Sequence, residues 1–167
     1  MKSLFTSALM IGLTAGTLLL EGCSMEGHTP AVSDKLSALR EVVNVQIPAT
    51  SARWEIFGTP EYKGGVPGPT DFTTLIAELQ PADGAWFASK QETAGTSFIA
   101  PEAARPWLSE PFHRLLAEHK NTTADLSALR DCRRYATTLK QSGSPVQGFV
   151  CGGDRRLLLY ITLSSPQ

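Results

Sequence analysis

The sequence has almost no excess of charge of either sign: 15 lysines and arginines are balanced by 16 acidic residues, so the net charge is −1. A chain this close to neutral has no basic field with which to hold nucleic acid. It also contains no glycine-rich phosphate-binding motif and no Gly-x-Ser-x-Gly nucleophile motif. No segment repeats at a fixed period, which excludes solenoid and propeller architectures. The apolar fraction of 42% in turn excludes a disordered chain.

Histidine is scarce as well, with three in the whole chain. His113 and His119 are six residues apart, which is about 240° around a helix, so they cannot share one metal ion. His28 lies in a polar N-terminal segment. The sequence therefore predicts no metal site and no cofactor. An enzyme would have to use Asp71 or Glu110 with a histidine, and a small hydrolase of this kind stays open as an alternative function.

Only three cysteines are present, and the first follows the one long apolar run of the chain. A single lysine is followed by 17 uncharged, mostly apolar residues (4–20), and the run ends in Leu20-Glu21-Gly22-Cys23. A short positive region, an apolar core and a small residue before the processing point predict an export signal. The segment resembles a bacterial lipoprotein signal peptide, whose lipobox is a leucine, two mostly small residues and a cysteine. Leu20, Gly22 and Cys23 match that pattern, and Glu21 stands where alanine or serine is usual.

The resemblance implies that the chain is cut before Cys23, which then carries a diacylglyceryl group and an amide-linked acyl chain. Three acyl chains hold a protein firmly to a membrane, because each buried CH₂ contributes about 0.8 kcal/mol. Ser24 rather than aspartate follows the cysteine. In Gram-negative members of this class, that implies the periplasmic face of the outer membrane. The alternatives are an uncleaved transmembrane helix, for which this run is short, and a cytosolic start at Met25.

The expected organisation is a signal peptide over 1–22, a lipidated cysteine with a flexible tether over 23–32, and a single domain over 33–167. The tether is polar and contains Gly and Pro. Removing the signal leaves 145 residues. A chain of that size buries about two-thirds of its unfolded surface and can fold without help.

Cys132 and Cys151 remain for a disulfide, which an oxidising periplasm favours. Segments 132–139 and 146–152 both have the pattern of strands. If Lys140–Gly143 is a four-residue hairpin loop, Cys132 falls directly opposite Cys151, where Cβ atoms are about 4.5–5.5 Å apart. Metal ligation is disfavoured, because no second cysteine or histidine lies two to five residues from either one.

The remaining pattern predicts an α+β domain, in which a mostly antiparallel sheet of about five or six strands carries two or three helices on one face. Leu157–Ile161 is apolar on both faces and is expected to be a central strand. The polar segment 121–131 is expected to hold a short helical turn. Helices are expected near 33–41, from 81, and within 103–120, most clearly from Glu110. Strands are expected at 43–47, 53–57, 71–80, 132–139, 146–152 and 155–163.

Arginines flank the expected disulfide hairpin and are candidates for a basic patch that contacts phosphate head groups, lipopolysaccharide or an acidic partner. The alternative is that they are solvent-facing strand residues paired with neighbouring aspartates. The arginines are Arg133, Arg134, Arg155 and Arg156, with Arg130 beside them, and the aspartates are Asp131 and Asp154.

Asp71 is a further candidate contact, because it follows a long loop rich in Pro and Gly (59–70), and ligand-contacting residues often sit on such loops. The alternative is that Asp71 bonds its own backbone. Trp54, Trp86 and Trp107 lie in apolar patterns that favour core packing over stacking on sugar rings.

Together these features favour a non-enzymatic binding or accessory protein of the cell envelope, anchored by lipid at Cys23 and facing the periplasm. Its partner would be an envelope protein or a toxin, and the latter would make it an immunity protein. A small hydrolase and a structural envelope component remain the alternatives. No nucleic-acid partner is expected.

Overall fold

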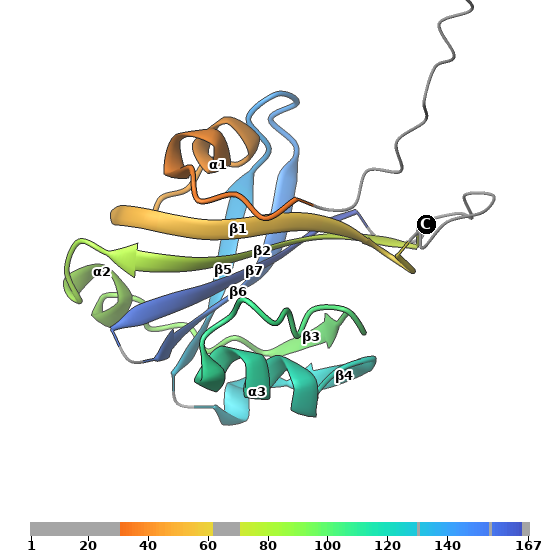
Figure 1. Cartoon of the computed structure of the whole chain (residues 1–167). Helices are drawn as coiled ribbons and strands as arrows, with labels where there is room; N and C mark the ends of the chain where they lie inside the picture. Colours follow the sequence, from red (N-terminus) through yellow and green to blue (C-terminus); the bar gives the residue numbers. More distant parts are fainter. Residues whose placement is uncertain (1–30, 62–70, 130, 154, 165–167) are drawn as a thin grey trace, which may run out of the picture.

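The computed structural model describes residues 31–61, 71–129, 131–153 and 155–164. Cys23, the signal peptide and most of the expected tether lie outside the described residues. Figure 1 shows one large sheet with smaller elements on both sides of it. The elements are, in order, α1 (Leu36–Val42), β1 (Ala49–Thr59), β2 (Phe72–Pro81), α2 (Ala85–Ala88), β3 (Thr96–Ile99), α3 (Glu110–Glu118), β4 (Thr122–Asp125), the 3₁₀ turn η1 (Leu126–Ala128), β5 (Cys132–Thr138), β6 (Pro145–Gly153) and β7 (Arg156–Ser164).

The five strands of the main sheet lie in the order β1-β2-β7-β6-β5, and every neighbouring pair is antiparallel. The α+β class and the mostly antiparallel sheet are thus confirmed. β7 lies at the centre, which explains why Leu157–Ile161 is apolar on both faces, since all five residues are buried. In the adjacent β2, which confirms the strand expected at 71–80, the side chains alternate between the two faces. Ile76 enters one core, whereas Leu75 and Ala77 enter the other.

Two hydrophobic cores lie on the two faces of this sheet. The first contains Phe112 and Leu116 of α3, together with Phe149 and Tyr160 of the sheet. The second contains Leu39 of α1, and α2 packs at its margin. The helices therefore divide between the two faces, and the prediction that they pack on one face is wrong. The central strands bury side chains on both faces, so each face needs a covering layer.

The β5–β6 hairpin has the register that the sequence predicted. The Leu139 amide donates to the Ser144 carbonyl (2.9 Å), which closes the four-residue loop between them. Cys132 consequently lies directly opposite Cys151. The two form a disulfide with a Cα–Cα distance of 4.0 Å, and both are buried. The predicted disulfide is therefore confirmed.

Two parts of the chain differ from the sequence prediction. The expected strand at 43–47 is absent, and only Val43 makes an isolated bridge, to Leu139. Val43 and Ile47 are nevertheless buried, because this stretch crosses the end of the β5–β6 hairpin instead of pairing along a strand. Conversely, β3 and β4 pair as a separate two-stranded sheet that was not predicted. Their four-residue, largely polar sequences give almost no periodic signal.

The two glycines at the end of β6 make room for one aromatic ring on each face of the sheet. A Cβ on Gly152 would come within 3.0 Å of the Phe87 ring, and a Cβ on Gly153 within 3.0 Å of the Phe112 ring. These rings bring α2 and α3 close to the sheet on opposite faces. Gly152 and Gly153 therefore serve packing on both faces of the sheet.

Candidate binding groove

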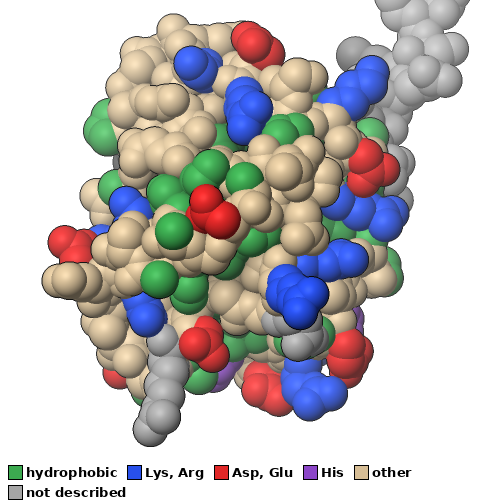
Figure 2. Space-filling view, turned by 90° about the vertical axis from the view of Figure 1, so that its left-hand side faces the viewer, with side chains coloured by type: hydrophobic (Ala, Val, Ile, Leu, Met, Phe, Trp, Pro, Cys, Tyr) green, Lys and Arg blue, Asp and Glu red, His purple; other side chains and the backbone are tan. Residues whose placement is uncertain are grey.

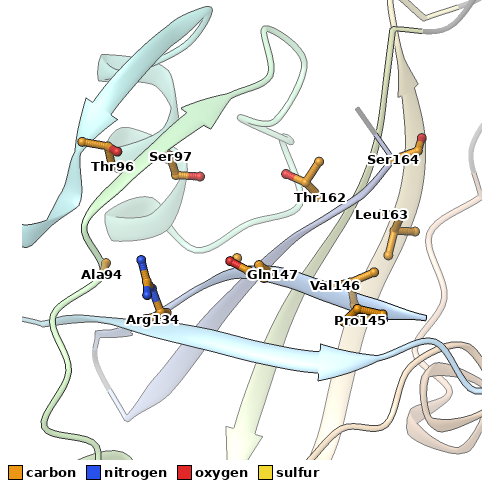
Figure 3. A pocket seen from close by; sticks show the side chains of 11 residues that line it. Ala94, Thr96, Ser97, Arg134, Pro145, Val146, Gln147, Thr162, Leu163 and Ser164 are labelled. Carbon is orange, nitrogen blue, oxygen red and sulfur yellow. The ribbon is translucent and has the colours of Figure 1, made fainter. Parts of the chain in front are cut away.

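A groove of about 380 Å³ opens between β3 and the β5–β6–β7 part of the main sheet. Its size falls within the range of about 300–1,000 Å³ that is typical of ligand sites. In Figure 3, Ser97 and Thr162 point toward each other across the groove, and Gln147 and Arg134 lie along the sheet below them. We call this the polar groove and define it by its polar side chains, which are Thr96, Ser97, Arg134, Gln147, Thr162 and Ser164.

The charge of the polar groove comes from Arg134. Among the described residues that line the groove there is no aspartate or glutamate. Within the described part of the chain, the exposed Arg134 side chain makes no hydrogen bond and no ion pair. The groove therefore offers one uncompensated cation beside hydroxyl and amide groups, a combination that favours an anionic polar ligand.

A second hollow adjoins the polar groove at Arg134. It has a volume of about 450 Å³ and lies between β5 and the segment that follows α2. Lys90 lies on its rim, with its ammonium group 4.9 Å from the centre of the Trp86 ring. We call it the edge hollow, and its lining residues are Ser89, Lys90, Gln91, Glu92, Arg134 and Ala136. The two hollows share Arg134, and the segment between them forms an isolated bridge to β5, from Thr93 to Arg133.

The four candidate arginines do not gather in one patch. Arg133 bonds the Lys90 carbonyl through Nε (2.9 Å) and stacks its guanidinium 5.4 Å from the Phe87 ring, on the α2 side of the sheet. Arg156 forms an ion pair with Glu78 on the opposite face. Arg155 is exposed at the β6–β7 turn, where it has a φ of 64°. Figure 2 accordingly shows lysine and arginine side chains interspersed with acidic ones. Arg130 and Asp154 lie outside the described residues.

Of the residues proposed for a hydrolase, Glu110 and His113 lie on α3, whereas Asp71 precedes β2. Glu110 is exposed and pairs with Arg114 one turn later on α3 (3.0 Å). Asp71 is exposed, and its amide donates to the Thr59 carbonyl (2.8 Å). His113 is half-buried on α3. Among the described residues, no group of three or more histidines, cysteines or acidic residues could hold a metal ion. Residues 62–70 of the Pro- and Gly-rich loop, and His28, lie outside the described residues.

Two buried glutamates, which were not among the predicted site residues, hold the 100–109 segment onto the sheet. Glu55 on β1 is 4% exposed; it pairs with Arg105 (2.7 Å) and accepts a hydrogen bond from Trp107 Nε1 (2.8 Å). Glu78 on β2 accepts the Ser109 amide (2.8 Å) through its second oxygen. Alternation places Glu78 on the same face as Ile76, so an inward-facing acid in an apolar strand was the signal that could have identified it.

A cavity of about 250 Å³ lies beside these glutamates. Its lining includes Arg53, Glu78, Trp107 and Arg156. Both arginines have a carboxylate partner, because Arg156 binds Glu78 and Arg53 lies 3.7 Å from Asp34. The charges of this cavity are thus compensated within the protein, in contrast to Arg134.

Burial also perturbs the two tyrosines of the main sheet. It raises the pKa of Tyr160 above its ordinary value, and the Ala100 amide that donates to the Tyr160 hydroxyl (2.9 Å) partly opposes this rise. Burial likewise raises the pKa of Tyr135, whose hydroxyl accepts the Gln46 amide (3.0 Å). Both hydroxyls hold connecting segments against the sheet, so we assign them a structural role.

Comparison with protein-family models, with curated proteins and with solved structures finds no match for this chain. The site must therefore be interpreted from its own geometry. Within the described residues, no helix is long and apolar enough to cross a membrane.

Proposed function

We propose that this protein is a lipid-anchored, non-catalytic binding protein of the bacterial cell envelope that faces the periplasm. The observation that carries the binding function is the polar groove, where Arg134 has no hydrogen-bond or ion-pair partner among the described residues and lies beside hydroxyl and amide groups. The buried carboxylates elsewhere are already bound by Arg105, Trp107, Arg156 and a backbone amide. This arrangement favours binding over hydrolysis.

Two features support the location. The lipobox-like segment that ends at Cys23 supports lipid anchoring. The disulfide between Cys132 and Cys151 supports an oxidising compartment, because such bonds persist there and are rare in the cytosol.

The geometry also fits an anchored binding protein. Ser33 pairs with Trp54 on the outer edge of β1, and it follows Cys23 by ten residues. Those ten residues span at most about 35 Å. β5, which carries Arg134, forms the opposite edge of the sheet, four strand spacings or about 19 Å away. An anchor at Cys23 would therefore join the domain at the β1 edge, and the β5 edge that carries Arg134 lies on the far side of the sheet.

Photo-crosslinking in living cells tests the binding function. A photoreactive amino acid is placed at Gln147 in the groove and, as a matched control, at Arg114 on the exposed face of α3. We expect a discrete adduct from position 147 and none from position 114. Adducts from neither position, or equal adducts from both, would refute a binding surface at the groove.

Membrane fractionation tests the anchor independently. Changing Cys23 to Ala should abolish metabolic labelling with palmitate and release the protein from the membrane fraction. A Cys23→Ala protein that is still cleaved and still sediments with membranes would refute lipid anchoring.

A further inference from the structure

One face of the main sheet changes from apolar to polar at the polar groove. Side chains two residues apart on a strand share a face. On the central strand β7, the buried Tyr160 of the first core is followed on the same face by Thr162, which is half-buried in the groove. On β6, the buried Phe149 shares its face with Gln147, which is exposed in the groove. The polar side chains therefore lie on the core-facing side of the sheet, just beyond the core itself.

The strand register brings these polar side chains side by side. Gln147 lies directly opposite Thr162, so their Cβ atoms are about 4.5–5.5 Å apart. Arg134 lies opposite Phe149, which makes it the diagonal neighbour of Gln147, about 7–8 Å away on the same face. Ser97 of β3 points toward Thr162 across the groove (Figure 3). The groove thus has a floor of amide and hydroxyl groups, a hydroxyl on its wall and a guanidinium to one side.

The neutral groups of the groove match the hydroxyls of a sugar. Hydroxyl and amide side chains both donate and accept hydrogen bonds, as sugar hydroxyls do. In the described part of the chain, the side chains of Ser97, Gln147 and Thr162 make no hydrogen bond, so their bonding capacity is open to a ligand. Small-molecule sites are usually lined by apolar and aromatic side chains. The described lining of the groove contains no aromatic ring, which disfavours a flat or apolar ligand.

The charge of the groove selects the acidic group of the ligand. Arg134 is the one cation in the described lining, and that lining holds no acid. One guanidinium pairs with one carboxylate through two parallel hydrogen bonds. A phosphate monoester carries about −1.5 to −2 charges at pH 7, so a single arginine would leave part of its charge uncompensated. The groove therefore favours a carboxylate over a phosphate.

We infer that the polar groove binds a sugar that contains a uronic acid. Its hydroxyls bond Ser97, Gln147 and Thr162, and its carboxylate pairs with Arg134. The bridge from Thr93 to β5 lies between the polar groove and the edge hollow, so the ligand is confined to the polar groove. This inference rests on the proposed binding function and names the ligand class of its site.

The binding test uses isothermal titration calorimetry of the full-length protein in micelles of a detergent without a sugar head group. The acidic probes are digalacturonate and diglucuronate. Their neutral counterparts, galactobiose and cellobiose, have a hydroxymethyl group in place of each carboxylate. Glutarate and inorganic phosphate supply negative charge without sugar hydroxyls. At least one acidic disaccharide should bind at least tenfold more tightly than its neutral counterpart, glutarate or phosphate.

Variants of the protein locate the effect. Arg134→Gln should weaken binding of the acidic disaccharide at least tenfold and leave the neutral counterpart within twofold. Thr162→Val, which removes one hydroxyl from the groove, should weaken binding of both sugars at least threefold. Arg114→Gln, which removes a surface arginine on α3, should leave both affinities unchanged. A thermal melt of each variant verifies that it is folded.

The outcomes separate the inference from the proposed function. Equal affinity for the acidic and neutral disaccharides would overturn recognition of a carboxylate by Arg134. Glutarate or phosphate binding as tightly as the acidic disaccharides would overturn recognition of the sugar hydroxyls. Binding of a capped hexapeptide of alternating glutamate and threonine, with no binding of any sugar, would replace the sugar with a protein segment. If no probe binds while position 147 still forms a discrete adduct in cells, this inference fails and the proposed function stands.

Discussion

The strongest test of how the fold is held together is removal of Arg105. Its side chain is 12% exposed, and its guanidinium pairs with Glu55 and Glu61 and stacks 4.2 Å from the centre of the Phe57 ring. Arg105 is the cationic member of the contacts that hold the 100–109 segment on β1 and β2. Replacing it with Met keeps the aliphatic length and removes the charge.

The loss of stability expected from Arg105→Met comes from Glu55, which stays buried without its counter-ion. Glu55 would keep the Trp107 hydrogen bond but lose its counter-ion while 4% exposed. Removing one member of a buried ion pair costs about 3–5 kcal/mol, because the remaining charge stays desolvated. For a domain of this size, about 3 kcal/mol corresponds to a fall in Tm of roughly 12 °C.

A double-mutant cycle isolates the interaction. Glu55→Gln, Arg105→Met and the combined variant are each unfolded in urea, and the free energies of unfolding are compared. The combined variant should be less destabilised than the sum of the two single variants, by more than about 1.5 kcal/mol. Arg114→Met serves as the control, because exposed pairs of this kind contribute about 0.3–0.5 kcal/mol. A loss below about 1 kcal/mol for Arg105→Met, or strict additivity, would refute the structural role of the pair.

Three further predictions follow from particular contacts. Replacing both Cys132 and Cys151 with Ala should lower the free energy of unfolding by about 3 kcal/mol in a urea titration, because the disulfide joins residues separated by 19 positions. A loss below about 1 kcal/mol would contradict this. Gly148→Ala should lower the stability by about 3 kcal/mol or more in thermal melts, since its Cβ would lie 1.8 Å from the Tyr160 carbonyl oxygen. Gly84→Ala is the control, because a Cβ there meets open space and should leave the stability nearly unchanged; equal effects would contradict the close approach at Gly148. Because burial raises the pKa of Tyr160, its contribution to stability should be fully present below about pH 10 and decline at higher pH as the unfolded chain ionises; a urea midpoint that stays constant from pH 9 to 12 would argue against this.

The elements that could be predicted from the sequence are those whose signal is local. The β5–β6 register follows from counting outward from the four-residue loop, and that count placed Cys132 opposite Cys151. The central position of β7 follows from an apolar run that needs cover on both faces. Likewise, α3 begins at Glu110, where its apolar stripe becomes clear.

The groove and the ion pairs could not be predicted, because they depend on tertiary contacts. Ser97, Arg134, Gln147 and Thr162 come from four different strands, and no spacing in the sequence relates β3 to the main sheet. Arg134 was a candidate contact, but the sequence did not distinguish it from Arg133, whose side chain lies on the opposite face. Similarly, Glu55 and Arg105 are 50 residues apart, so their pairing becomes visible only when the 100–109 segment packs on β1.

Photo-crosslinking from the polar groove is the most direct test, because Arg134 in this groove carries the proposed binding function. A photoreactive amino acid at Gln147 should give a discrete adduct in cells, and that adduct should be lost when Arg134 is changed to Gln. Equal adduct yields from position 147 and from position 114 on α3, or an adduct at position 147 that Arg134→Gln leaves unchanged, would contradict a binding surface at the groove.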